Sequence, residues 1–287
     1  AVRTAHSTAG DAVQLQILIV DNGSTDGSVD VFASELPDAR VIALPENCGF
    51  ACAVNAGLEQ ATGRYAFVLN SDIEFRGAAI QQLIEALQTN DSAALACPKL
   101  LRPDGSVQAA VVPEPCLVWE LTNRSVARRL LRTPQDRTTS VPSVVGPCMA
   151  VDMERIREVG FMDTRFFFFF EETDWCKRIR DKGFRIVYVP SAEVLHLQGA
   201  SANRRPTRAR IQFYTSRYKY FRKHGGTAVS GTLYAGLFVR LTLDLLLHSL
   251  LVLLTAGRRR HRDRVAVYAT LWLWHLLACR PRWGFES

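Results

Sequence analysis

A cluster of acidic residues follows an unusual aromatic run in the second half of the chain. Phe166–Phe170 are five consecutive phenylalanines, and they are followed at once by Glu171, Glu172 and Asp174. Acids at the start of a helix and the basic segment 177–182 near its end predict a helix that begins at this cluster. The phenylalanine run is apolar and short, which indicates a buried strand or the wall of a turn. The segment could therefore hold a general base, although such acids are also ordinary partners of the helix dipole.

Two further carboxylates stand at the ends of apolar segments. Residues 15–21 read as a strand that ends in Asp21, and residues 65–69 read as a strand followed by Asn70, Ser71 and Asp72. Ligands of α/β sheets collect at the carboxyl ends of the strands. A carboxylate there can hold a hard divalent cation, which can bridge a diphosphate. The same tripeptide is also common in turns.

His196 ends a short predicted strand, 193–196, and precedes Gly199 and Ser201. A single histidine after a strand is more often structural than a ligand, and its place downstream of the acidic helix is what favours a functional role. The sequence has no Gly-x-x-x-x-Gly-Lys loop and no Gly-x-Gly-x-x-Gly after a strand. A nucleotide would therefore be held by carboxylates and a metal.

The predicted elements that position these residues alternate between strands and helices. Strands over 15–21, 40–44 and 65–69 are separated by helices that end near Glu35 and that cover 50–61, and a periodic helix follows over 78–89. This order predicts an α/β fold with a mostly parallel central sheet flanked by helices. Residues 97–150 are less regular, with a loop over 124–137. A helix over 151–160 and strands over 184–189 and 193–196 are expected beyond them.

The last part of the chain has a different composition. Residues 228–257 are long and apolar, and Arg240, Asp244 and His248 lie four apart on one helix face. A second apolar helix over 265–278 follows the block Arg258–Arg264, which holds five arginines in seven residues. A membrane span, a helix in the membrane interface and a buried helix pair are all compatible with this pattern. The basic block between aromatic-bearing apolar helices favours a membrane surface facing the cytoplasm, and we expect no nucleic-acid partner.

Composition narrows the class of protein. The 287 residues suffice for one large domain or two small ones, and the net charge is +7. The seven cysteines are scattered and include no Cys-x-x-Cys pair. Zinc or redox motifs are therefore not expected, and a reducing compartment is favoured.

The order of the motifs resembles family 2 glycosyltransferases with the GT-A fold, most closely the rhamnosyltransferase-like branch. The resemblance covers about residues 15–225. It rests on six motifs in fixed order: Val20-Asp21-Asn22-Gly23-Ser24-Thr25-Asp26-Gly27-Ser28, Asn47-x-Gly49-Phe50, Asn55-x-Gly57, Leu69-Asn70-Ser71-Asp72, Phe169-Phe170-Glu171-Glu172-Thr173-Asp174-Trp175-Cys176 and Val194-Leu195-His196-x-x-Gly199-x-Ser201.

The resemblance implies a role for each matching residue. Asp21 corresponds to the acid that contacts the nucleoside, Asp72 to the metal ligand, and His196 to a residue that completes the metal and diphosphate site. Glu172 corresponds to the general base. The remaining donor-binding residues would be Asn22, Asn47, Gly49, Asn55 and Asn70, and the residues that support the acceptor site would be Glu171, Asp174 and Trp175.

The implied activity is the inverting transfer of a single sugar, with rhamnose as the candidate, from a nucleoside-diphosphate sugar to a saccharide or polyprenyl-linked acceptor, with Mg²⁺ or Mn²⁺ as cofactor. A processive synthase would carry Gln-x-x-Arg-Trp, whereas Arg282-Trp283 is preceded by Cys279. We expect a catalytic domain over 1–225 and a membrane-associating helical region over 226–287, held at the cytoplasmic face in cell-envelope polysaccharide synthesis.

The sequence departs from the family pattern in two places. Glu172 stands where the family usually has Asp, and Asn70 replaces the first acid of the stricter metal motif. The opening strand of the type Val-x-Val-x-Ile-Val-x-Tyr-Asn is missing, and residues 1–7 resemble the end of the helix that follows it, so we expect an N-terminally truncated chain. The alternatives are an inactive fragment or membrane-bound scaffold, and a sugar nucleotidyltransferase.

Overall fold

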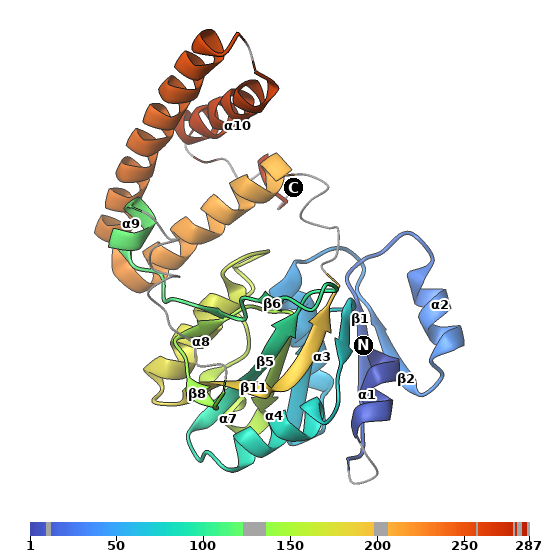
Figure 1. The fold of residues 1–287 in the computed structure, drawn as a ribbon. Coiled ribbons are helices and arrows are strands. Elements are labelled where there is room, and N and C mark those ends of the chain that lie inside the picture. Colours follow the sequence, from blue (N-terminus) through green and yellow to red (C-terminus); the bar gives the residue numbers. More distant parts are fainter. Residues whose placement is uncertain are drawn as a thin grey trace. The chain divides into compact units, whose positions relative to one another are not determined.

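The protein is described by a computed structural model that covers residues 1–9, 13–122, 136–197, 206–256, 258–277, 279 and 283–285. It forms two compact units (Figure 1). The described parts of Ala1–Glu114, Arg128–Phe167 and Glu171–Gly199 make the first, and those of Pro115–Ala127, Phe168–Phe170 and Ala200–Ser287 make the second. Gly199, Ser201, Arg282 and most of the predicted loop over 124–137 lie outside the described residues.

The first unit begins with alternating helices and strands. They are α1 (Val2–Ala9), β1 (Ile17–Asp21), α2 (Ser28–Glu35), β2 (Ala39–Ala43) and α3 (Phe50–Gln60). β1 and β2 pair in parallel as a sheet of their own. α2 packs on both strands and α3 packs on β1. The expected elements are thus present, with ends within about two residues of those the sequence predicts.

A larger sheet carries the rest of this unit. Its main strands run in the order β3 (Tyr65–Leu69), β10 (Cys148–Asp152), β5 (Ala93–Leu101), β11 (Arg185–His196) and β4 (Ile73–Phe75). β6 (Val107–Gln108) adds to β5, β8 (Thr139–Ser140) adds to β11, and β7 (Val111–Val112) pairs separately with β9 (Ser143–Val144).

The α/β class is as predicted, but the expectation that strands would be mostly parallel is wrong for this sheet. β5 and β11 are parallel, whereas β3–β10, β10–β5 and β11–β4 are antiparallel. The strict strand–helix alternation ends at β3, which β4 follows without a helix before α4 (Ala79–Gln88). Because antiparallel neighbours need no helical crossover, the irregular middle segment can supply such strands directly.

Two boundaries in this region also differ from the expectation. The predicted helix over 151–160 is the end of β10 followed by α7 (Met153–Val159), and Asp152 between them accepts hydrogen bonds from the N–H groups of Glu154 and Arg155. The two strands predicted over 184–196 are one strand, β11, with a register irregularity between Val189 and Glu193.

Helices bury the apolar faces of the large sheet. α4 packs on β5, β10 and β11, and its Leu83 and Leu87 are fully buried. α8 (Glu171–Asp181) packs on β9 and β11 and buries Trp175 and Ile179. The large fixed core holds the strand ends, and therefore the residues that follow them, in place.

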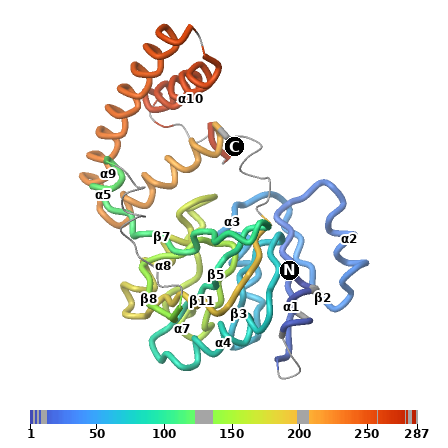
Figure 2. The backbone as a smooth tube through the Cα atoms, in the orientation of Figure 1, coloured from blue at the N-terminus to red at the C-terminus, as the bar shows by residue number. Residues whose placement is uncertain are grey.

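The second unit consists of helices. α5 (Leu117–Leu121) packs on α9 (Pro206–Leu254), and α10 (Arg259–Leu276) folds back along α9 (Figure 2). α9 is interrupted at Gly226, whose φ of 79° and ψ of −177° are not helical. Among the described residues α9 is the one helix that could cross a membrane by length and composition, with a mean hydropathy of 2.0 in its most apolar window.

Candidate active site

Asp72 and His196 lie together at one edge of the large sheet. Asp72 follows the turn after β3 and directly precedes β4, whose Ile73 pairs with His196 at the end of β11. This register places Asp72 Oδ1 3.5 Å from His196 Nε2. His196 is buried, whereas the Asp72 side chain is partly exposed. The structure thus unites the two residues expected to bind a metal.

The second ring nitrogen of His196, Nδ1, contacts Gln108, and this contact bears on the role of Nε2, the nitrogen that faces Asp72. His196 Nδ1 lies 2.9 Å from Gln108 Oε1. An amide oxygen only accepts, so this contact places a hydrogen on Nδ1 and leaves Nε2 as the ring atom that can offer a lone pair to a cation. A nitrogen and an oxygen donor atom that converge in this way suit a divalent cation.

This donor set is small. Among the described residues no group of three or more His, Cys, Asp and Glu side chains could hold a metal ion. The residues present therefore fit a cation whose remaining ligands come from the substrate or from water, as is usual for Mg²⁺ bound with phosphates.

The loops that follow β1 and β2 form a second part of the site. Asp21 is buried, and its Oδ2 accepts a hydrogen bond of 2.9 Å from Ser24 N. Asn22 donates to Asn47 Oδ1 and to the carbonyl oxygen of Gly49, and accepts from Cys48 N. The predicted donor-binding residues of these two loops are thus held together by their own side chains.

Glycine is required at one position of the first loop. Gly23 has a φ of 77°, and a Cβ there would lie 2.6–2.7 Å from backbone atoms of Glu46 and Asn47. Backbone atoms cannot move aside as a flexible side chain does, so any other residue would force the two loops apart.

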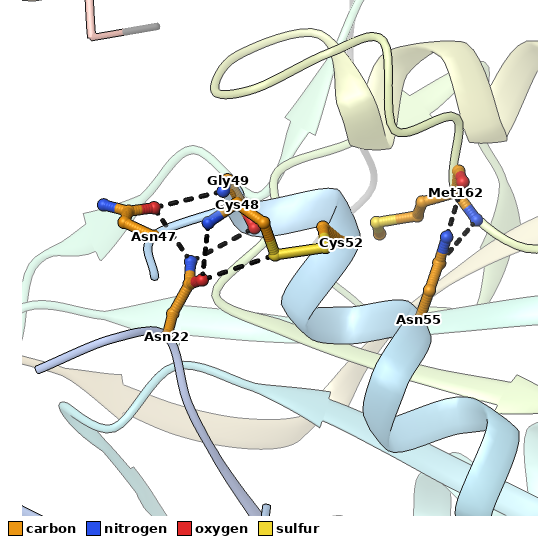
Figure 3. Close-up of a disulfide and its surroundings, with 7 residues drawn as sticks. All are labelled: Asn22, Asn47, Cys48, Gly49, Cys52, Asn55 and Met162. Atoms are coloured by element: carbon orange, nitrogen blue, oxygen red, sulfur yellow. Dashed lines mark hydrogen bonds between the residues drawn. A yellow bond between two sulfur atoms is a disulfide. The ribbon is translucent and has the colours of Figure 1, made fainter. Parts of the chain in front are cut away.

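A disulfide joins the second loop to α3. Cys48 and Cys52 are bonded, with their Cα atoms 5.8 Å apart (Figure 3). This bond was not expected from the sequence, whose cysteines include no Cys-x-x-Cys pair. The cysteines are four apart rather than three, and the first turn of α3 brings them together across the helix start.

Gly49 links this loop to the phenylalanine run. Phe50 N donates a 2.9 Å hydrogen bond to the carbonyl oxygen of Phe167. A Cβ on Gly49, whose φ is 90°, would lie 2.5 Å from that same oxygen. Only glycine permits this approach, which explains why the motif has Gly before Phe50.

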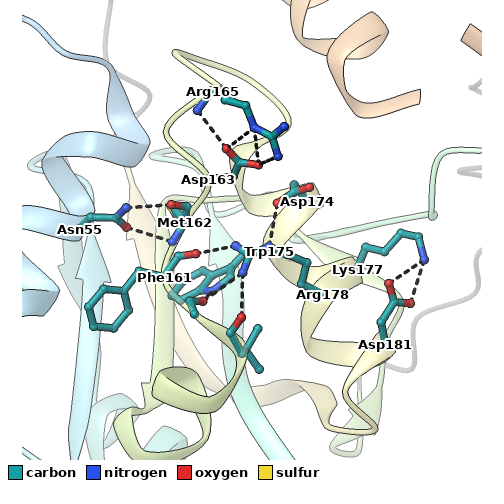
Figure 4. A network of polar contacts seen from close by, with 12 residues as sticks. Asn55, Phe161, Met162, Asp163, Arg165, Asp174, Trp175, Lys177, Arg178 and Asp181 are labelled. Carbon is teal, nitrogen blue, oxygen red and sulfur yellow. Dashed lines mark hydrogen bonds and ion pairs between the residues drawn. The ribbon is translucent and has the colours of Figure 1, made fainter. Parts of the chain in front are cut away.

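Asn55 contacts a backbone segment. Its side chain donates to Met162 O at 2.8 Å and accepts from Met162 N at 2.9 Å (Figures 3 and 4). This pair of bonds joins α3 to the segment that leads into the phenylalanine run. The contact gives Asn55 a role in positioning, in addition to the donor binding that the resemblance implies.

The phenylalanine run forms bends and no strand, so of the two expected structures it is the turn. Phe166 and Phe170 are buried, and Phe169 and Phe170 have φ values of 68° and 69°. Positive φ is strained for residues with a bulky side chain. Two such residues in succession, directly before Glu171, mark the segment that delivers the acidic helix as a constrained one.

Glu171 and Glu172 occupy the first turn of α8. The Oε2 atoms of both are buried and have no hydrogen-bond partner among the described residues. Burial, and then the charge of Glu172, raise the pKa of Glu171 well above its usual value. Burial also raises the pKa of Glu172, to about 7. A carboxylate that titrates near neutral pH is suited to general base catalysis.

Asp174 and Trp175 hold α8 in place. Asp174 is fully buried and accepts a 2.9 Å hydrogen bond from Arg178 Nε (Figure 4). Arg178 also donates to the carbonyl oxygens of residues 159–161, and Trp175 Nε1 donates to Gly160 O. These contacts fix the position of α8, and the support of the acceptor site expected of both residues stays a prediction.

Sequence reasoning missed three features of this site: the Gln108 contact to His196, the Cys48–Cys52 bond and the Asn55–Met162 pair. The cysteine spacing across a predicted helix start was a usable signal for the second. Nothing in the sequence around Gln108 indicates its partner, 88 residues away.

Comparison with known proteins decides the family. The sequence profile described as Glycosyl transferase family 2 matches residues 3–160, more than half of the chain. This chain belongs to glycosyl transferase family 2. It is therefore a glycosyltransferase, and the alternative of a sugar nucleotidyltransferase is set aside.

One similar protein is a rhamnosyltransferase, in agreement with the branch of the family that the motifs resemble. This chain is 28% identical over 236 residues to the N-acetylglucosaminyl-diphospho-decaprenol L-rhamnosyltransferase of Mycobacterium tuberculosis. The aligned region covers 74% of this chain and 76% of that protein.

Solved glycosyltransferases share the fold. The mannosyltransferase PcManGT from Pyrobaculum calidifontis, in complex with GDP-Man and Mn²⁺, superimposes with a TM-score of 0.52 and 16% identity over 99% of this chain and 83% of its own. GalNAc-T7 with UDP, GalNAc and Mn²⁺ gives a TM-score of 0.54 and 16% identity over 76% of this chain and 47% of its own. These likenesses establish the GT-A fold of the family 2 chain.

Proposed function

We propose that this glycosyltransferase transfers one sugar, with inversion, from a nucleoside-diphosphate sugar to a lipid-linked saccharide acceptor. The observation that carries the proposal is the approach of His196 Nε2 to Asp72 Oδ1, 3.5 Å apart at a strand end, in the same unit as Glu172, whose Oε2 is buried and whose pKa is about 7. Asp72 and His196 suit a cation bound to a diphosphate, and the glutamate suits removal of a proton.

The chemistry of an inverting transfer assigns the roles. Glu172 takes the proton of the acceptor hydroxyl as that oxygen attacks the anomeric carbon, and the bond to the diphosphate breaks on the opposite side. Asp72 and His196 would hold Mg²⁺ or Mn²⁺, which supplies positive charge to the departing diphosphate. Asn22 and Asn47 would shape the nucleoside pocket through the hydrogen bond that joins their loops, and Asp21 through the bond that it accepts from Ser24 N within its own loop.

Rhamnose is the proposed sugar and a polyprenyl-diphosphate-linked saccharide the proposed acceptor. Support comes from the rhamnosyltransferase relative, whose name specifies a decaprenol-linked acceptor. We place the catalytic function in residues 1–225 and membrane association in 226–287.

The surface of α9 supports association with a membrane. Apolar residues that are 51–78% exposed recur along its second half at helical spacing: Val239, Leu243, Leu246, Leu247, Leu250, Leu253 and Leu254. The helix face that meets α10 is instead aromatic, with Phe238 stacked on Trp272. An exposed apolar stripe of this length, beside a basic segment, suits the surface of an anionic membrane.

The charges within this helix favour an in-plane position on the cytoplasmic face. Arg240 Nε lies 3.9 Å from Asp244 Oδ2, and His248 is buried against His261 and Arg264. Charged groups in the hydrocarbon of a bilayer are costly even when paired. A helix lying in the interface keeps these groups near water while its leucines enter the lipid.

A donor screen tests the proposed reaction. Purified protein comprising residues 1–287 in detergent is supplied with polyprenyl-diphosphate N-acetylglucosamine, Mg²⁺ or Mn²⁺ and a panel of nucleoside-diphosphate sugars, and released nucleoside diphosphate is measured. We expect release with a rhamnose donor, loss of release in chelator, and one added sugar of inverted anomeric configuration by NMR. Release in chelator would remove the metal from the mechanism, and the absence of transfer with every donor would favour the inactive fragment or scaffold.

A further inference from the structure

Gln108 lies on the same face of the large sheet as His196. In the strand register Gln108 pairs with Leu100 of β5, and Leu100 pairs with Val194 of β11. Paired residues project their side chains to the same side, and so do residues two apart along a strand. His196, two residues beyond Val194, therefore shares the face of Gln108, and the glutamine side chain reaches it across β5.

The Gln108 contact decides which nitrogen of His196 carries the hydrogen. Gln108 Oε1, 2.9 Å from Nδ1, accepts a hydrogen that Nδ1 carries, and a ring with its single hydrogen there keeps Nε2 as an acceptor. The ring is buried, at 8% exposure, so few other groups can perform this task.

Loss of that contact would favour the opposite arrangement. Asp72 Oδ1, 3.5 Å from Nε2, would attract the imidazole hydrogen to Nε2. A hydrogen between these two atoms would block the place that a cation would share with them. The Gln108 amide thus favours the ring state in which Nε2 and Asp72 can share a cation.

We propose that Gln108 is a positioning residue that keeps His196 in the Nδ1–H tautomer, so that Nε2 and Asp72 together can bind the divalent cation of the donor complex. The inference rests on the proposed metal site. Gln108 lies on the short strand β6, away from the strand-end loops, so β6 would contribute to the reaction through the orientation of His196.

Metal binding gives the first test. Mn²⁺ binding to the full-length protein is measured by electron paramagnetic resonance with and without UDP, GDP or dTDP, for the wild type, Gln108→Leu, Gln108→Glu and Val107→Ala. Gln108→Leu should weaken Mn²⁺ binding by about 10–100-fold, the usual effect of removing such a partner. Gln108→Glu, which still accepts from Nδ1, should stay within about threefold of the wild type. Val107→Ala changes the exposed neighbour in the same strand and should have no effect.

The tautomer gives a second test that does not depend on metal. Long-range ¹H–¹⁵N spectra of ¹⁵N-histidine-labelled protein, assigned with a His196→Gln sample, report the protonated nitrogen of His196. The wild type and Gln108→Glu should show Nδ1–H, and Gln108→Leu should show Nε2–H. A merely structural role for Gln108 would leave this signature unchanged.

The two measurements separate the inference from the proposed function. If the wild type binds no Mn²⁺ with any nucleotide, the metal site fails, and the tautomer spectra alone decide the role of Gln108. Wild-type Mn²⁺ affinity in a folded Gln108→Leu protein, or an Nδ1–H tautomer that persists in it, would overturn the inference.

Discussion

Glu172 is half-buried in the first turn of α8, and its Oε2 is buried without a hydrogen-bond partner among the described residues. We predict that Glu172→Gln lowers kcat by about 100-fold or more, because an amide cannot accept the acceptor proton. Donor affinity should be retained, because the change is isosteric. Single-turnover kinetics and calorimetric titration with donor measure the two quantities. Glu158→Gln, on the exposed face of α7, is the matched control, and near-normal turnover in Glu172→Gln would rule out the assignment.

The raised pKa of Glu172 also predicts how activity and stability change with pH. A base must be deprotonated, so kcat/KM should rise with pH and level off above the pKa of about 7. Because burial raises the pKa of the folded state, that state binds more protons than the unfolded chain between about pH 4.5 and pH 7. The Glu172 contribution to the free energy of unfolding is therefore present below pH 4.5 and lost as pH rises through 7. Glu172→Gln should flatten this dependence in urea titrations at pH 5 and pH 8, and an unchanged slope would show that another group is responsible.

At the scale of elements, much of the first unit was predictable from sequence. β1, α3 and β3 combine apolar runs of ordinary length with glycine or polar residues at their ends, so local pattern alone specifies them. The direction and order of the strands that follow α4 were not predictable in this way. Their pairing depends on contacts between residues far apart in the chain, such as Ala150 with Ala96 and Val194 with Phe75.

The same distinction applies to the site. Asp72 and His196 could be selected as candidates because each follows an apolar strand, but their 3.5 Å approach depends on the pairing of Ile73 with His196. The Gln108 contact depends on two successive registers, β6 with β5 and β5 with β11. Residue type identifies chemistry in a sequence, whereas the partner of a residue is a property of the folded sheet.

The disulfide across the start of α3 should make the loop after β2, which is proposed to bind the donor, sensitive to reduction. We predict that Cys48→Ser with Cys52→Ser, or reduction of the wild type, lowers the free energy of unfolding by about 2 kcal/mol, from the loop-closure entropy of a short loop. Tm should then fall by about 4–8 °C. Nucleoside-diphosphate affinity should also fall, because Cys48 N donates to Asn22 within the donor loops.

Scanning calorimetry and titration with UDP, GDP and dTDP, with and without reductant, check this prediction. Cys116→Ser, at a free cysteine, is the control and should respond to reductant as the wild type does. Thiols are kept reduced in the cytoplasm, so the reduced protein represents the form at the proposed cytoplasmic face. Equal Tm values with and without reductant would show that the bond does not stabilise the loop.

At the scale of the whole molecule, the helices of the second unit offer lipid two kinds of contact. The leucine stripe of α9 supplies apolar area, and Arg259, Arg260 and Arg262 are exposed at the start of α10. Stable binding of a protein to a membrane surface usually needs two such signals together. Each basic residue near an anionic surface contributes about 1 kcal/mol, which is lost at high salt.

We therefore predict that full-length protein sediments with vesicles containing phosphatidylglycerol and less with vesicles of phosphatidylcholine alone. Changing Arg259, Arg260 and Arg262 to Gln should weaken the anionic component by about 100-fold or more at low salt, since about 1 kcal/mol is lost per residue. Changing Leu246, Leu250 and Leu253 to Ser should weaken binding to both kinds of vesicle, because it removes apolar area. Arg157→Gln and Val31→Ser, exposed residues of the first unit, are the matched controls. Sedimentation that neither triple variant reduces would show that the lipid contact lies elsewhere, and full-length protein that stays in the supernatant with both vesicles would show that this unit does not bind membranes.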